Sequence, residues 1–325
     1  MDLFKAVGAV ICAILLFLLV KTVTLGVVSR LFTVRLRGKN IFITGCDTGI
    51  GRLLALKLAT EHEAKVYAGC LTTDGAETLA KESKGRICAL PLDITKDDSV
   101  ESAYERVKEE LGGAPLFALV NNAGLSRGWF VEFTPIECFE KTLEVNFIGT
   151  VRVTQRFLPL LIAGKGRLVT ITTSLTLVAN AGSGAYSSSK YALHYFLDIL
   201  RKEVTQFGVQ FVEICPGLTV TPFVEGVTSS ASACFESADA RVRERYGGVA
   251  FINRFRTLFN STIVKLLRGK PSSVVTVLLL ALSSVFPRRR YLVGLDAFFT
   301  WRVLGLLPAT AQDYLSRLTG ITTQA

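Results

Sequence analysis

The sequence is short of the side chains that build metal centres and disulfide frameworks. Its 325 residues include two histidines, and its seven cysteines form no Cys-x-x-Cys pair. Protein metal sites need clustered Cys and His ligands, so we expect no metal. The cysteines are odd in number and irregularly spaced, and several lie in apolar, strand-like runs. We interpret them as reduced core residues, which favours a cytosolic environment.

Charge and proline are also scarce. Charged residues make up 20% of the chain, hydrophobic residues 50%, and there are nine prolines. This composition excludes a disordered chain and fits one large domain with an appendage. The net charge is +10, but no arginine-rich tract is interleaved with aromatics, so we expect no nucleic-acid partner. A basic, apolar chain is more typical of a protein at an anionic membrane surface.

The N-terminus carries a stretch with almost no charge. Residues 6–29 contain one charged side chain, Lys21, and as a helix they would be roughly 36 Å long, enough to cross the hydrocarbon core. A cleaved signal peptide is less favoured, because no small-x-small site follows the apolar run. Four basic residues follow between 30 and 39. The positive-inside rule therefore predicts a single-pass protein with a cytosolic body, and residues 1–37 as its anchor and basic flank.

Beyond residue 38, short apolar runs alternate with amphipathic stretches. We expect strands at 41–44, 65–70, 87–90, 116–121, 166–172, 209–215 and 290–293. We expect helices at 51–62, 135–157 and 188–207, and one that opens with a capping box at Thr95. This alternation predicts the α/β class, as a Rossmann-like, doubly wound parallel sheet over residues 38–296.

The last third of the chain lacks a strand pattern over 223–270, which we interpret as a helical insertion on the substrate side. Residues 272–286 are apolar and uncharged, but they are too few for a span and fit a last core helix. Residues 297–307 carry one charge, Arg302. We expect 297–325 to be a helical, apolar extension that lies on the membrane.

A glycine-rich turn follows the first expected strand and opens the first helix. Its sequence is TGCDTGIG, residues 44–51. Glycines let backbone N–H groups approach a pyrophosphate, and the helix N-terminus adds partial positive charge. The turn therefore indicates a dinucleotide site, with an ordinary glycine turn as the alternative.

Three further features support the dinucleotide interpretation. Asp93 follows a strand and can accept a hydrogen bond from an adenine amino group. The sequence NNAG (121–124) ends another strand, at the edge where ligands bind. The sequence YSSSK (186–190) puts Tyr186 and Lys190 on one helical face. There an ammonium group would stabilise a phenolate and bring its pKa, ordinarily about 10, towards neutral pH.

Together these motifs resemble the short-chain dehydrogenase/reductase family from about residue 38 to 222. The sequences GCLT (69–72), LDIT (92–95), VNNAG (120–124) and RYLVGLDA (290–297) are most similar to its membrane-anchored retinol and hydroxysteroid dehydrogenases. The 3-hydroxybutyrate dehydrogenases are a rival resemblance. The family implies an NAD(P)-dependent oxidoreductase that interconverts a lipophilic alcohol and its carbonyl. A catalytically silent nucleotide-binding protein is the alternative outside the enzymes.

The resemblance also implies roles for individual residues. The catalytic set is Tyr186, Lys190, Asn146 and a hydroxyl from Ser174 or Thr173. Residue type favours Ser174, our preference, whereas counting along the strand favours Thr173. The cofactor-binding set is Gly45, Asp47, Thr48, Gly49, Ile50, Gly51, Cys70, Asp93, Ile94, Asn121, Ala123, Gly124, Tyr186, Lys190, Pro216, Gly217 and Thr221.

The residues at the end of the second strand bear on the choice between NAD and NADP. The sequence CLTT (70–73) offers neither an acid for the ribose hydroxyls nor an arginine for a 2′-phosphate. No Lys or Arg occurs between Lys65 and Lys81, so we expect NAD, with NADP as the alternative. The other expected partners are a small lipophilic substrate and membrane lipid, and a homo-oligomer is left open. We expect the endoplasmic reticulum membrane, although the sequence itself does not specify an organelle.

Overall fold

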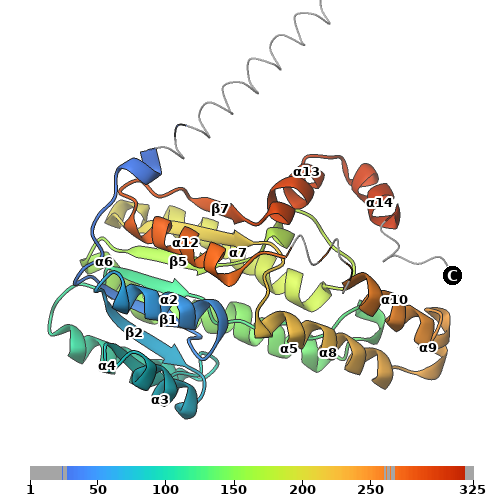
Figure 1. Ribbon diagram of the computed structural model, residues 1–325, viewed down its shortest axis with the longest axis horizontal. Helices are drawn as coiled ribbons and strands as arrows, with labels where there is room; N and C mark the ends of the chain where they lie inside the picture. Colours follow the sequence, from blue (N-terminus) through green and yellow to red (C-terminus); the bar gives the residue numbers. More distant parts are fainter. Residues whose placement is uncertain (1–23, 25–27, 260, 262–263, 265–267, 319–325) are drawn as a thin grey trace, which may run out of the picture.

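The fold is built on a parallel sheet. The structure is a computed structural model that describes residues 24, 28–259, 261, 264 and 268–318. In this part of the chain seven strands pair in the order β3-β2-β1-β4-β5-β6-β7, all in parallel (Figure 1). Their bounds are β1 (Asn40–Thr44), β2 (Lys65–Cys70), β3 (Ile87–Pro91), β4 (Ala118–Asn121), β5 (Arg167–Ile171), β6 (Gln210–Pro216) and β7 (Arg290–Val293). The predicted doubly wound sheet is confirmed.

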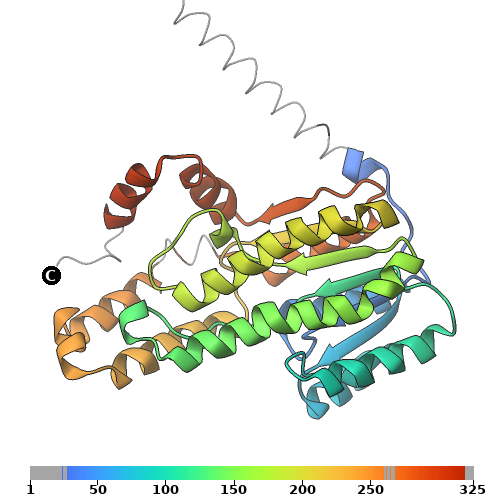
Figure 2. The same ribbon diagram turned by 180° about the vertical axis from the view of Figure 1, so that it is seen from behind.

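Alternate residues of a strand enter two separate cores. On β1, Ile41 and Ile43 face one core and Phe42 faces the other, as the two-residue period of a strand requires. One core is covered by α2 (Gly49–Thr60), α3 (Thr73–Glu82) and α12 (Pro271–Ser283), and the other by α4 (Asp97–Leu111), α6 (Thr150–Ala163) and α7 (Gly184–Val204) (Figures 1 and 2). The predicted core helix after residue 270 is thus α12, which packs against α2.

The sheet order determines where a ligand can bind. Strand β1 pairs with β2 on one side and with β4 on the other. The chain therefore adds β2 and β3 on one side of β1, and then β4 to β7 on the other side. Ligands of such sheets bind outside the carboxyl ends of the strands, next to this reversal. The helices α5 (Ile136–Leu143), α8 (Pro222–Ser237), α9 (Ala240–Arg245) and α10 (Val249–Phe259) lie beyond that edge (Figure 1).

Three local predictions differ from the structure. Helix α4 begins at Asp97 with no side-chain cap, so the capping box at Thr95 is wrong; its hydroxyl donates to Asp93 Oδ1 instead, at 2.7 Å. Helix α7 begins at Gly184, four residues earlier than expected, which puts Tyr186 inside the helix. The helix expected over 135–157 contains a π-helical segment, η2 (Glu144–Gly149).

The two ends of the described chain lie on one side of the molecule. Residues 28–36 lie alongside the end of α12, where Thr33 and Ser284 form an isolated antiparallel bridge. After β7 come η5 (Ala297–Trp301), α13 (Arg302–Leu304) and α14 (Ala309–Leu318), the helical extension expected there. In the described part of the chain no helix is both long enough and apolar enough to cross a bilayer. The span expected at 6–29 lies almost wholly outside the described residues.

Candidate active site

A cavity of about 790 Å³ opens at the carboxyl edge of the sheet. Most residues of the predicted site line it: Gly45, Asp47, Thr48, Gly49, Ile50, Asp93, Ile94, Ala123, Gly124, Thr173, Ser174, Tyr186, Lys190, Pro216, Gly217 and Thr221. Gly51, Cys70, Asn121 and Asn146 do not line the cavity, and each adjoins residues that do. Motifs spread over 177 positions of sequence, from 45 to 221, therefore meet in one place.

The glycine turn is packed against the end of β4. Gly45 has φ +71°, and a Cβ there would lie 2.8 Å from the Ala123 Cα. A Cβ on Gly51 would lie 2.4 Å from the Asn122 amide nitrogen. That amide donates to the carbonyls of Thr44 and Gly45, at 2.8 and 2.9 Å. Asn122, which lines the cavity, was not among the predicted site residues, although the NNAG motif that contains it was a signal for it.

The turn fits a dinucleotide. Gly49 has φ +63° and opens α2, and among the described residues the nearest side chain to a Cβ there would be Thr221, at 3.9 Å. Backbone donors at this helix N-terminus therefore border open space, as phosphate binding requires. Asp47 accepts from the backbone N–H groups of Leu71 and Thr72, at 2.7 and 3.0 Å. Asp47 thus brings to the end of β2 the carboxylate that the β2 sequence lacks.

Burial changes the acidity of both members of the Tyr-Lys pair. Lys190 is 4% exposed, and its Nζ donates to the Ile171 carbonyl at 2.9 Å. Burial lowers the pKa of Lys190 to about 8. Burial raises the pKa of Tyr186 to about 12, and a hydrogen-bonding interaction with Thr173 opposes that rise. The Phe223 ring lies against Tyr186, 5.6 Å between centroids.

The two candidate hydroxyls after β5 differ in what they face. The Thr173 hydroxyl interacts with Tyr186 and accepts from the Leu175 N–H at 3.3 Å. Ser174 is 1% exposed, and its Oγ has no hydrogen-bond partner among the described residues. Thr173 is thus the residue whose hydroxyl interacts with the phenol, whereas our preference from residue type was Ser174, and both residues line the cavity.

Asn146 lies in η2, fully buried. Its Nδ2 donates to the Leu125 carbonyl at 2.8 Å and to Ser189 Oγ at 2.9 Å, and its Oδ1 accepts from the Leu125 N–H at 2.8 Å. A Cβ on Gly124 would lie 3.1 Å from this Oδ1 and 3.4 Å from Lys190 Nζ. The Asn146 amide therefore connects η2 to α7. It also lies next to the space beside Gly124 that the Lys190 ammonium group borders.

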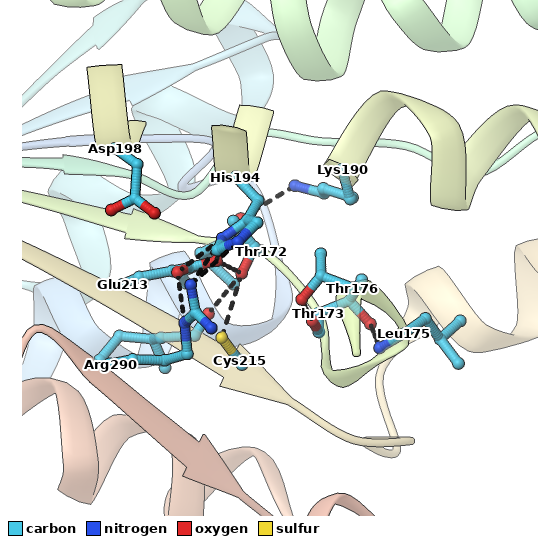
Figure 3. A network of polar contacts seen from close by, with 12 residues as sticks. Thr172, Thr173, Leu175, Thr176, Lys190, His194, Asp198, Glu213, Cys215 and Arg290 are labelled. Atoms are coloured by element: carbon cyan, nitrogen blue, oxygen red, sulfur yellow. Dashed lines mark hydrogen bonds and ion pairs between the residues drawn. The ribbon is translucent and has the colours of Figure 1, made fainter. Parts of the chain in front are cut away.

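A buried carboxylate behind the site joins the strand and the helix that carry these groups. Glu213 of β6 accepts from Thr172 Oγ1 at 2.7 Å and from Arg290 Nε at 2.8 Å, and lies 3.0 Å from His194 Nδ1 (Figure 3). Burial acts to raise the pKa of Glu213, but hydrogen bonds with His194 and Thr172, together with the charge of Arg290, hold that pKa below its ordinary value. The sequence analysis missed this network.

The Glu213 network is adjacent to the catalytic candidates in both sequence and space. Thr172 lies between Ile171, whose carbonyl binds Lys190, and Thr173, which contacts Tyr186. His194 follows Lys190 by one turn of α7. Glu213 therefore fixes β5 and α7 relative to each other at the point where both reach the cavity.

The fold and the site define a nicotinamide-dependent oxidoreductase of the doubly wound class. A family model described as "short chain dehydrogenase" matches residues 39–232. Two solved structures share the fold, with TM-scores of 0.67 each. One is a short-chain dehydrogenase from Streptomyces avermitilis, at 22% identity over 88% of this chain and 98% of that one. The other is a short-chain dehydrogenase/reductase from Burkholderia phymatum in complex with NAD, at 19% identity over 83% and 94%.

Curated relatives cover most of the chain. The 17-beta-hydroxysteroid dehydrogenase type 6 of Bos taurus is 37% identical over 86% of this chain and 88% of the relative. Retinol dehydrogenase 5 of Mus musculus is 37% identical over 84% and 86%, and retinol dehydrogenase 16 of Mus musculus is 36% identical over 91% and 95%. The chain belongs to the short-chain dehydrogenase family. It is an NAD(P)-dependent alcohol dehydrogenase, as the motifs predicted.

The Glu213 network predicts a measurable contribution to stability. Replacing Thr172 by valine keeps its shape but removes a hydrogen bond to a charged group, so Thr172→Val should lower the free energy of unfolding by about 1.5–3 kcal/mol. Thr142→Val is the matched control, because Thr142 is buried but its hydroxyl has no partner among the described residues. Denaturant unfolding should show little or no loss for the control. Equal losses in both variants would contradict a role for the Thr172–Glu213 bond.

Proposed function

We propose that Tyr186 accepts the hydroxyl proton of a substrate alcohol as the alcohol is oxidised to its carbonyl. Thr173 binds the same substrate oxygen and holds it against the phenol, with Ser174 as the alternative. The cofactor supplies the hydride acceptor. The position of Thr173, Tyr186 and Lys190 on the wall of one cavity carries this proposal, because a proton acceptor must lie within hydrogen-bond reach of the group it deprotonates.

Lys190 allows the Tyr186 phenol to ionise near neutral pH in this proposal. A phenol with a pKa of about 12 is almost wholly protonated at neutral pH and so cannot accept a proton. A neighbouring ammonium group stabilises the phenolate, which can. One helical turn separates the two side chains, and both line the cavity. Asn146 keeps η2 next to Lys190, where a water relay could take up the proton that the pair releases.

The remaining cofactor contacts follow the fold. We propose that the turn at 44–51 binds the pyrophosphate, Asp93 and Ile94 the adenine, and Pro216, Gly217 and Thr221 the nicotinamide amide. The position of Asp47 at the end of β2 supports NAD over NADP, since a carboxylate there accepts from ribose hydroxyls and repels a 2′-phosphate. Arg52 donates to the Asp47 backbone carbonyl at 3.3 Å and is paired with Glu82 at 3.0 Å.

An apolar substrate fits the outer part of the cavity. Its wall there includes aromatic and aliphatic side chains, namely Trp129, Phe223, Val227, Phe255 and Phe259. The curated relatives are named as hydroxysteroid and retinol dehydrogenases, and both names denote lipophilic alcohols. We propose a substrate of that type rather than a short hydroxy acid such as 3-hydroxybutyrate.

We further propose that the protein works at a membrane. Residues 1–37 would form the anchor and its basic flank, 38–296 the catalytic domain with 223–270 as its substrate-side insertion, and 297–325 a segment on the bilayer. Phe32, near the start of the described chain, forms an exposed aromatic pair with Phe286, which follows α12. Phe299 is 74% exposed and Leu306 81%. Both views place residues 28–32 and α13 on the same side of the molecule, as a lipid-facing side requires (Figures 1 and 2).

The proposal that Tyr186 accepts the proton predicts how turnover changes when its hydroxyl oxygen is removed. Tyr186→Phe keeps the ring and removes the hydroxyl, so turnover should fall roughly 10²–10⁴-fold while NAD binding persists. The assay follows NADH formation with retinol, 3α- and 17β-hydroxysteroids and 3-hydroxybutyrate as candidate alcohols. Residual turnover above about a tenth of wild type would exclude Tyr186 as the proton acceptor.

The two hydroxyls can be ranked directly. Thr173→Val and Ser174→Ala each remove a hydroxyl with little change in volume, and kcat should fall further in Thr173→Val because that hydroxyl interacts with Tyr186. The ratio of the two kcat values under saturating NAD is the measurement. A larger loss in Ser174→Ala would restore the assignment that residue type favours.

The membrane proposal predicts a cytosolic body. In microsomes that contain the full chain, added protease should digest the catalytic domain without detergent. Asn260, the acceptor of the chain's single Asn-x-Ser/Thr triplet, should carry no glycan. A catalytic domain that resists protease until detergent is added would place it in the lumen.

A further inference from the structure

A buried carboxylate lines the cavity beside the turn that ends β6. Asp296 follows β7, is 6% exposed and borders the cavity. Its Oδ2 accepts from the Leu218 N–H at 2.7 Å. Its Oδ1 has no hydrogen-bond partner among the described residues, although Trp301 interacts with the same carboxyl group. A buried carboxylate oxygen without a donor is costly, and such a group commonly has a ligand or a functional role.

Two glycines keep this carboxylate against the turn. A Cβ on Gly217 would lie 2.0 Å from Asp296 Oδ1, and one on Gly294 would lie 2.6 Å from it. Any other residue at Gly217 would therefore displace the carboxylate from the Pro216–Gly217 turn. That turn and Thr221 are the elements we assign to the nicotinamide amide, so the inference rests on that assignment.

The described ion pairs leave the Asp296 charge without a protein counter-ion. Burial accordingly raises its pKa, against the hydrogen bonds of Leu218 and Ala297. The nicotinamide ring carries a positive charge in NAD⁺ and none in NADH, whereas the phosphates are the same in both. A carboxylate at this position would distinguish the two oxidation states of the cofactor electrostatically.

We infer that Asp296 is the counter-charge of the oxidised nicotinamide ring. It binds NAD⁺ more favourably than a neutral residue would and leaves NADH nearly unaffected. The protein consequently favours the oxidised cofactor, the state from which alcohol oxidation begins.

The test is the affinity of each cofactor form for the full-length protein. Asp296→Asn keeps an acceptor for the Leu218 N–H and removes the charge. NADH binding is measured by its fluorescence and NAD⁺ binding by competition. The dissociation constant for NAD⁺ should rise roughly tenfold, as about 1.4 kcal/mol of lost attraction implies, with that for NADH within about twofold.

Two controls separate this role from a structural one. Asp93→Asn removes a carboxylate from the same cavity and should leave the ratio of the two dissociation constants unchanged. Thermal unfolding of Asp296→Asn checks that the variant is folded, and Asp296→Ser replaces it if it is not. An equal rise in the dissociation constants for NAD⁺ and NADH would show that Asp296 only supports the turn, and would overturn the inference. No change in either constant would overturn it too. Failure of the wild-type protein to bind either form would instead refute the cofactor assignment.

Discussion

The Tyr186 phenol and the Lys190 ammonium group, one helical turn apart on the wall of one cavity, form the pair on which the proposed chemistry depends. Burial disfavours the charged form of both groups. It lowers the pKa of the lysine to about 8, so the lysine still carries most of its charge at neutral pH, and it raises the pKa of the tyrosine to about 12. A phenolate at neutral pH therefore needs a neighbouring positive charge, and the buried ammonium group, held by the Ile171 carbonyl, is the charge that we propose for it.

The surrounding structure holds this pair in place. The Ile171 carbonyl fixes the ammonium group, and the next residue, Thr172, is bound to Glu213 of the neighbouring strand. Glu213 also binds His194, one turn beyond Lys190 on α7. Strand and helix thus cannot shift independently at the point where both supply reactive groups. Close placement of this kind matters because a misplacement of about 1 Å can cost 10²-fold in rate.

The sequence predicts the fold well, because strand periodicity and glycine turns are local features. It also identifies the pair Tyr186 and Lys190, since four residues are one helical turn. It misses Glu213, which lies in an apolar strand run and gains its partners only when β5, β6, β7 and α7 meet. Asp296 was missed for the same reason: the space for its carboxylate depends on Gly217, 79 positions away in the chain. The choice between Thr173 and Ser174 depends on strand register, which residue type cannot determine.

The pH dependence of alcohol oxidation in the wild type and in Lys190→Met tests the pairing most directly. Oxidation needs the unprotonated base, so the wild-type rate under saturating NAD should rise with pH and then level off. Removing the ammonium group removes the charge that stabilises the phenolate, so the phenol's pKa should rise. The account predicts that the residual activity of Lys190→Met rises only at distinctly higher pH. An identical apparent pKa in the two proteins would show that Lys190 does not control the base.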